Sequence, residues 1–235
     1  ELLWRVHHGG DITLAGVQPI RKFVDSRYDC SDFRLQSVLR ILHEYGDQLS
    51  PDIHHELKRM LLDFKYWMTE PGNDGMCFWS ENHQILFAAA EYLAGQLYPK
   101  DVFTNNGETG QHRMDQARMR ILSWLRWRWL FGFSEWYSNV YYVEDIAALS
   151  NLIDFAQDEE IVRKSQIILD LLMYDLASQS FKGNFVSTMG RSYARGKKSG
   201  QQASTRCITK ELLGYTRGSP DRRGMDLNFF YRKHY

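Results

Sequence analysis

The stretch WSENHQ, residues 79–84, stands directly before the apolar run ILFAAAEYLAGQLYP, residues 85–99. The spacing of the apolar residues predicts a buried helix, and Ser80 is of a residue type that caps helix N-termini. A cap needs one polar residue and a core needs none, yet an acid, an amide and an imidazole follow Ser80 in succession. The sequence therefore predicts a helix whose polar entry faces a cleft.

A similar layout recurs in WYSNVYYVEDIAALSNLIDFAQDEE, residues 136–160. Like residues 79–101, this stretch begins with an aromatic residue, then serine and asparagine, continues as an Ala-rich apolar helix and ends in an acidic turn. Small residues such as Ala88 and Ala147 allow neighbouring helices to approach closely. Such repetition favours helical hairpins stacked side by side, with these two helices in an inner layer.

Apolar periodicity and turn residues predict six helices, paired as antiparallel hairpins over residues 31–68, 80–131 and 138–180. Strands have almost no support before residue 180. The expected fold class is all-α: antiparallel helical hairpins that form part of an (α/α) toroid or an incomplete barrel. In such an arrangement the ends of the inner helices line a cleft.

Three regions are expected along the chain. Residues 1–30 are predicted to be an irregular N-terminal segment, 31–180 the helical-hairpin domain, and 181–235 a basic, glycine-rich loop with an irregular tail. The first residue is Glu1, and no signal peptide is visible. We therefore expect a processed product or a piece of a longer polypeptide, with further domains of that polypeptide as possible partners.

The composition argues against several partners. Lys and Arg number 29 and Asp and Glu also 29, with a pI near 7.3, so no overall field attracts nucleic acid or an anionic membrane. No apolar run reaches the roughly 18 residues of a membrane span. Cys30, Cys77 and Cys207 lie far apart, without metal-ligand spacing. No metal, cofactor, nucleic-acid or membrane partner is predicted.

The first candidate site is the helix entry Glu81-Asn82-His83. A purely structural interpretation is that Glu81 complements the helix dipole while Ser80 takes part in a capping arrangement. That interpretation explains Glu81 but requires neither Asn82 nor His83. The functional interpretation is an amide that binds an anionic oxygen beside an imidazole that moves a proton.

The second candidate is the aromatic and acidic entry EWYSNVYYVED, residues 135–145. Its side chains either form an interfacial aromatic cluster with solvated carboxylates, or line a cleft. In a cleft, tyrosines can protonate a leaving oxygen and carboxylates can act as acid or base. The candidate catalytic residues here are Tyr137, Tyr141, Tyr142, Glu144 and Asp145.

The third candidate is the loop STMGRSYARGKK, residues 187–198, in which glycines frame Arg191, Tyr193 and Arg195. It is either a solvated basic loop or a mobile cationic loop that binds carboxylates through the forked guanidinium. The alternating Arg and Trp of residues 118–133 are interpreted as ladders on a packed outer helix.

Together these residues resemble the toroid-fold polysaccharide lyases, with alginate and chondroitin AC-type lyases nearest in kind. Those families carry an Asn and His pair, a Tyr and Arg residues around a uronate. The resemblance covers roughly residues 79–195 and is one of layout. Gln84 follows the pair where the alginate lyases have an aromatic residue, and the chain holds about half the hairpins of a full toroid.

The resemblance implies β-elimination in a uronate-containing polysaccharide. The substrate carboxylate must be neutralised, its α-proton removed and the leaving oxygen protonated. Asn82 with Arg191 or Arg195 would perform the first task and His83 the second. Tyr137, Tyr141 or Tyr142 would supply the acid. The implied substrate-binding residues are Trp79, Trp136, Asn139, Arg191, Tyr193 and Arg195.

Two alternatives remain open. A glycoside hydrolase on the same fold would use Glu81 with Glu144 or Asp145, with Trp79 and Trp136 as sugar platforms. A non-catalytic helical-repeat scaffold would bind a protein partner on its concave surface. Either carbohydrate interpretation implies an extracellular or periplasmic location.

Overall fold

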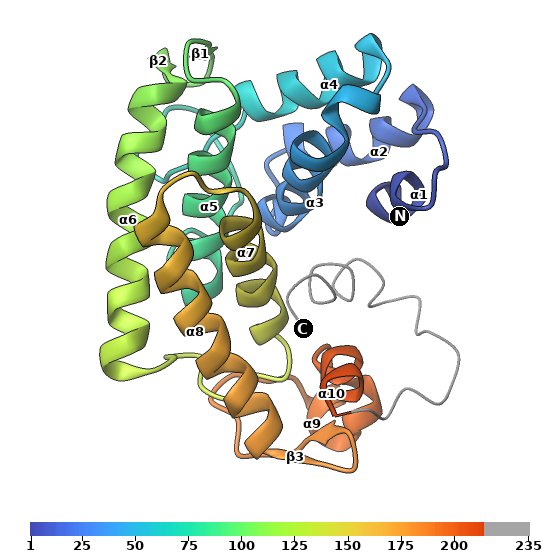
Figure 1. The fold of residues 1–235 in the computed structure, drawn as a ribbon, viewed down its shortest axis with the longest axis vertical. Coiled ribbons are helices and arrows are strands. Elements are labelled where there is room, and N and C mark those ends of the chain that lie inside the picture. The colour runs from blue at the N-terminus through green and yellow to red at the C-terminus, as the bar shows by residue number, and fades with distance from the viewer. Residues whose placement is uncertain (214–235) are drawn as a thin grey trace.

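A computed structural model describes residues 1–213, and Figure 1 shows that they are mainly helical. The predicted all-α class is confirmed. The α-helices are α1 Leu2–His7, α2 Leu14–Asp25, α3 Ser31–Tyr45, α4 Pro51–Leu62, α5 Glu81–Leu97, α6 Gly110–Phe131, α7 Tyr142–Phe155, α8 Glu159–Ser178, α9 Ala194–Lys198 and α10 Arg206–Leu212. The 3-10 turns are η1 Gly46–Gln48 and η2 Gly200–Gln202, and the short strands are β1 Val102–Phe103, β2 Glu108–Thr109, β3 Ser180–Phe181 and β4 Asn184–Phe185.

Helices α3, α5 and α7 pack against one another and form an inner layer. Helices α6 and α8 pack on the outer side of α5 and α7, as Figure 1 shows. Ala88 to Ala90 and Ala148 are buried, so small side chains let the inner helices approach closely. The hairpins α5–α6 and α7–α8 match the expected pairing, whereas α4 packs mainly on α2 and only slightly on α3. Closure into a toroid stays a prediction.

A buried polar seam joins the three inner helices. The Gln36 side chain of α3 donates to the Leu86 carbonyl of α5 at 3.0 Å, and Asn151 of α7 donates to Gln36 Oε1 at 3.0 Å. Arg40 of α3 donates to Asn151 Oδ1 at 3.1 Å and pairs with Asp154 at 2.5 Å. Because buried polar groups are costly without partners, these bonds fix the relative position of the helices.

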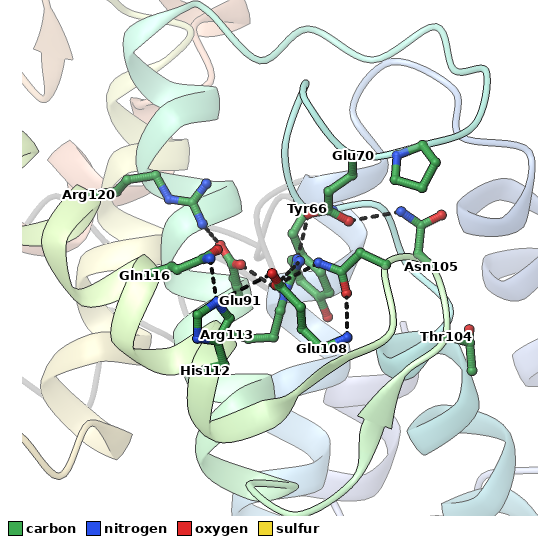
Figure 2. Close-up of polar contacts among 12 residues, drawn as sticks. Tyr66, Glu70, Glu91, Thr104, Asn105, Glu108, His112, Arg113, Gln116 and Arg120 are labelled. Atoms are coloured by element: carbon green, nitrogen blue, oxygen red, sulfur yellow. Dashed lines mark hydrogen bonds and ion pairs between the residues drawn. The ribbon is translucent and has the colours of Figure 1, made fainter.

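A buried ion network fastens the α5–α6 hairpin (Figure 2). Arg113 of α6 pairs with Glu91 of α5 at 2.9 Å, with Glu70 at 2.6 Å and with Glu108 at 3.5 Å. Arg120 forms a second ion pair with Glu91. Arg113 and Glu91 are fully buried. In this network each buried carboxylate is neutralised by a guanidinium.

The prediction that residues 1–30 are irregular is wrong, because this segment contains α1 and α2. Leu3, Val17 and Val24 are buried, and the Thr13 side chain caps α2 by accepting from the Gly16 amide at 3.2 Å. The apolar positions are few and Pro19 lies inside the helix, so the periodic signal is weak. Tertiary packing on α3 and α4 stabilises these short helices.

The predicted second helix is too long, since α4 ends at Leu62 rather than near Trp67. The carbonyl of Leu61 accepts from the Tyr66 hydroxyl at 2.9 Å, and that of Leu62 from the Thr104 amide at 2.9 Å. These long-range donors replace the next helical turn. They come from side chains and from the β1–β2 connection, which local periodicity does not reveal.

The prediction of an irregular segment after residue 180 is also wrong in part. Strands β3 and β4 pair as an antiparallel hairpin, and α9 and α10 follow. Phe185 and Ile208 are buried, which explains why this segment folds. The rest of the predicted tail, residues 214–235, lies outside the described residues. Within residues 1–213, no helix is long and apolar enough to cross a membrane.

Candidate functional site

The N-terminal ends of α3, α5 and α7 meet at one face of the inner layer. His83 of α5 bonds to Asp32 of α3, while Glu81 and Asn82 contact the segment that precedes α7. The dipoles of three helices therefore present their positive ends to the same region. Carboxylates from all three helices, Asp32, Glu81 and Glu144, lie in this region.

Glu81 fastens the segment before α7 to the start of α5. Its carboxylate accepts from the Ser134 amide at 2.6 Å, the Ser134 hydroxyl at 2.7 Å and the Glu135 amide at 3.3 Å. It also pairs with Arg128 at 2.5 Å. With these donors its oxygens are satisfied, so Glu81 positions its neighbours.

Asn82 and Arg191 meet at the carboxylate of Glu135. The Asn82 side chain donates to Glu135 Oε2 at 2.6 Å, its backbone amide to the same oxygen at 3.2 Å, and Arg191 forms an ion pair with Oε1. Asn82 and Glu135 are buried, whereas the Arg191 side chain is 43% exposed. Arg191 thus presents further donors to solvent. Glu135 stands in the aromatic stretch but was not among the predicted site residues.

Tyr141 and Tyr193 form a hydroxyl pair next to Arg191. Their oxygens lie 2.5 Å apart, and the Arg191 guanidinium carbon lies 4.0 Å from the centre of the Tyr141 ring. Burial, and then the hydrogen bond to Tyr193, raise the pKa of Tyr141, and the charge of Arg191 opposes that rise. Arg191 therefore contacts the tyrosine pair on one side and, through Glu135, is linked to Asn82 on the other.

The loop that carries Arg191 is held by two predicted substrate-binding residues. The Trp136 carbonyl accepts from the Gly190 amide at 2.9 Å, and Asn139 Oδ1 accepts from the Ser192 hydroxyl at 2.7 Å. A Cβ at Gly190 would collide with the Trp136 ring, which explains the glycine before Arg191. Trp136 and Asn139 therefore position the loop.

His83 lies on the other side of α5, towards α3. Its Nδ1 bonds to Asp32 Oδ2 at 2.7 Å, its Nε2 lies 3.8 Å from Asp29 Oδ1, and its ring stacks on Phe33 with centroids 4.9 Å apart. Asp32 is fully buried and burial raises its pKa. Both ring nitrogens thus face carboxylates at the start of α3.

The two acidic residues of α7 differ in their surroundings. Glu144 lines a cavity of about 520 Å³ between α1, α2, α3 and α7, and burial, then the charge of Asp32, raises its pKa to about 8. Asp145 is fully buried, and neither of its oxygens has a hydrogen-bond partner among residues 1–213. Burial raises its pKa well above the ordinary value. Both carboxyls therefore retain a proton more readily than ordinary ones.

The remaining predicted residues lie outside this cluster or inside the core. The Tyr142 hydroxyl is buried, accepting from the Tyr137 amide at 2.8 Å and donating to Asp175 at 3.3 Å. Trp79 is 71% exposed, and Arg195 lies in α9 with an exposed side chain. No described contact joins Trp79 or Arg195 to Arg191, Tyr141 or Tyr193.

Comparison with known proteins finds no matching family model, no matching curated protein and no matching solved structure.

Proposed function

We propose that this chain is a polysaccharide lyase that cleaves a uronate-containing polysaccharide by β-elimination. The observation that carries the proposal is that Tyr141 and Tyr193 lie against the partly exposed guanidinium of Arg191, whose partner Glu135 also binds Asn82. A carboxylate-binding cation, a neutral amide and two phenols at one place supply the groups that this reaction requires.

Arg191 is the group that would neutralise the uronate carboxylate. Its side chain already binds a carboxylate, that of Glu135, and it is exposed enough to offer remaining donors to a second one. A guanidinium has five N–H donors in a planar fork, so it can serve two carboxylates. Withdrawing charge from the substrate carboxylate makes the α-proton easier to remove.

The Tyr141–Tyr193 pair would carry the protons. The reactive pair holds one proton between its two phenol oxygens and takes the α-proton from substrate. The carbon–oxygen bond to the leaving sugar breaks, and the pair returns one proton to the leaving oxygen. The pair ends with the single proton with which it began. Arg191, 4.0 Å from the Tyr141 ring, favours the one-proton form.

The role of His83 as the base stays a prediction. Its Nδ1 is bonded to Asp32 and its Nε2 faces Asp29, which turns both nitrogens towards α3. The tyrosine pair lies directly against the carboxylate-binding arginine, and we therefore assign the proton transfers to it.

The test is the near-ultraviolet absorbance of unsaturated sugars formed from a panel of uronate polysaccharides. We expect Tyr141→Phe to reduce the rate by about 100-fold or more, as loss of a general acid–base group does. The matched control is Tyr174→Phe, because Tyr174 lies exposed on α8, and it should retain the wild-type rate. Full activity of Tyr141→Phe would overturn the assignment, and a comparable loss in His83→Ala alone would return the base to His83.

A glycoside hydrolase is the second candidate, favoured by one observation. Burial, and then the charges of Glu81 and Glu135, raise the pKa of Asp145. A protonated carboxyl near an ionised one is the pairing that glycosidases use. New reducing ends without new absorbance, abolished by Asp145→Asn, would support this candidate. Neither product with any substrate would favour the binding scaffold.

A further inference from the structure

We infer that Asp29, Cys30 and His83 form a zinc site at the start of α3. One ligand atom of each residue lies within 4.8 Å of the other two. In a tetrahedral zinc site, bonds of about 2.0–2.3 Å place ligand atoms about 3.5 Å apart. Asp29 has a 61% exposed side chain, so it can make the small adjustment that remains.

The surroundings of His83 are those of a metal ligand. Its Nδ1 bonds to Asp32 at 2.7 Å, which leaves Nε2 to face Asp29 at 3.8 Å. A carboxylate on the far nitrogen fixes the ring of a zinc-bound histidine and strengthens it as a ligand. Phe33 stacks on the ring and holds its plane. Asp32 is buried and its Oδ1 has no hydrogen-bond partner among the described residues.

The backbone at Cys30 provides an independent observation. The backbone of Cys30 adopts the left-handed conformation, with φ of 69°. Residues other than glycine rarely adopt this conformation. The strain places the thiol beside His83 and at the wall of the 520 Å³ cavity. Strained residues persist where the surrounding structure imposes them, often at binding sites.

The charge and ligand types select the metal. Asp29 and Asp32 place negative charge near the Cys30 thiol, and Arg34 is the nearby cation. A divalent cation would relieve that repulsion. Thiolate and imidazole suit zinc, whereas magnesium and calcium prefer oxygen ligands. Three protein ligands beside a cavity leave a fourth position open for water or a substrate oxygen, as in catalytic zinc sites.

The experiment measures metal bound to the purified chain after removal with a chelator and addition of zinc. We expect one zinc per chain in the wild type. Cys30→Ser should lose this binding, and Asp32→Asn should weaken it about 10- to 100-fold, as loss of an outer partner does. Cys207→Ser is the matched control, because Cys207 lies in α10 away from the cluster, and it should bind zinc like the wild type.

Cobalt substitution and thiol alkylation read the site directly. Cobalt in the wild type should give a thiolate charge-transfer band that Cys30→Ser lacks, and zinc should protect Cys30 from alkylation. Equal zinc content in Cys30→Ser and Cys207→Ser would overturn the site. So would alkylation of Cys30 in the zinc-loaded wild type, a result that does not depend on whether any variant folds. Tyr141→Phe should keep the zinc, so this outcome is separate from that of the proposed lyase.

Discussion

Two regions of this molecule bury carboxylates, and they balance them differently. Around Arg113, the carboxylates of Glu70, Glu91 and Glu108 each pair with a guanidinium (Figure 2). At the face where α3, α5 and α7 begin, Asp145 has no hydrogen-bond partner in the described part of the chain, and Glu144 retains a proton more readily than usual. Carboxylates paired with a guanidinium stabilise the α5–α6 hairpin. Buried carboxylates without such a partner lower the free energy of unfolding, and groups of this kind are typical of functional sites.

The largest expected effect comes from breaking the balanced network. Arg113→Ala would leave buried carboxylates without their shared partner, so the free energy of unfolding should fall by about 3–5 kcal/mol. Chemical denaturation measures the change. The exposed Arg126 of the same helix is the control, and Arg126→Ala should stay within about 0.5 kcal/mol of the wild type. An equally small change in both variants would remove the contrast between the two regions.

The unmatched region should respond to pH in the opposite sense to an ordinary ion pair. The pKa of Glu144 is raised from 4.5 to about 8, so the folded chain holds a proton that the unfolded chain releases. Stability linked to this group is complete below pH 4.5 and is lost as pH rises towards 8. Over that window, at about 1.4 kcal/mol per pKa unit, we expect a loss of about 5 kcal/mol.

Glu144→Gln should remove that loss, because the amide does not ionise. The variant should be more stable than the wild type above pH 8 and nearly equal to it below pH 4.5, as measured by denaturation at each pH. Glu159→Gln, an exposed change at the start of α8, should keep the wild-type pH dependence. A parallel pH dependence for Glu144→Gln and the wild type would show that Glu144 carries no such cost.

The smallest expected effect concerns the strained Cys30. Glycine adopts its left-handed conformation freely, so Cys30→Gly should be about 1 kcal/mol more stable than Cys30→Ala. Both variants lack the thiol, so thermal unfolding of the pair isolates the backbone term. No difference between them would mean that the conformation stores no strain.

The sequence predicted the helices that carry strong apolar periodicity. Helices α5 and α7 and their hairpin partners were found because long periodic stretches identify buried faces. Helices α1 and α2 were missed because they are short and are stabilised by packing on α3 and α4. The early end of α4 depends on donors from distant parts of the chain, which local patterns do not contain.

The sequence identifies candidate residues by their type, but it does not reveal which residues they contact. Asn82, Arg191 and Tyr141 were singled out, yet Glu135 and Asp32, which hold Asn82 and His83, were not. Each of these partners lies more than fifty positions away in sequence. The Asp29, Cys30 and His83 cluster was missed for the same reason, since His83 comes from a different helix end.

The most direct test of the tyrosine-pair account is the pH dependence of elimination by the wild-type chain, followed by near-ultraviolet absorbance. Because burial raises the pKa of Tyr141, the one-proton pair becomes more common as the solution becomes alkaline. The account predicts a rate that still rises between about pH 7 and pH 10. An imidazole base would give a plateau above about pH 7. A plateau there, or no absorbance with any uronate polysaccharide, would contradict the account.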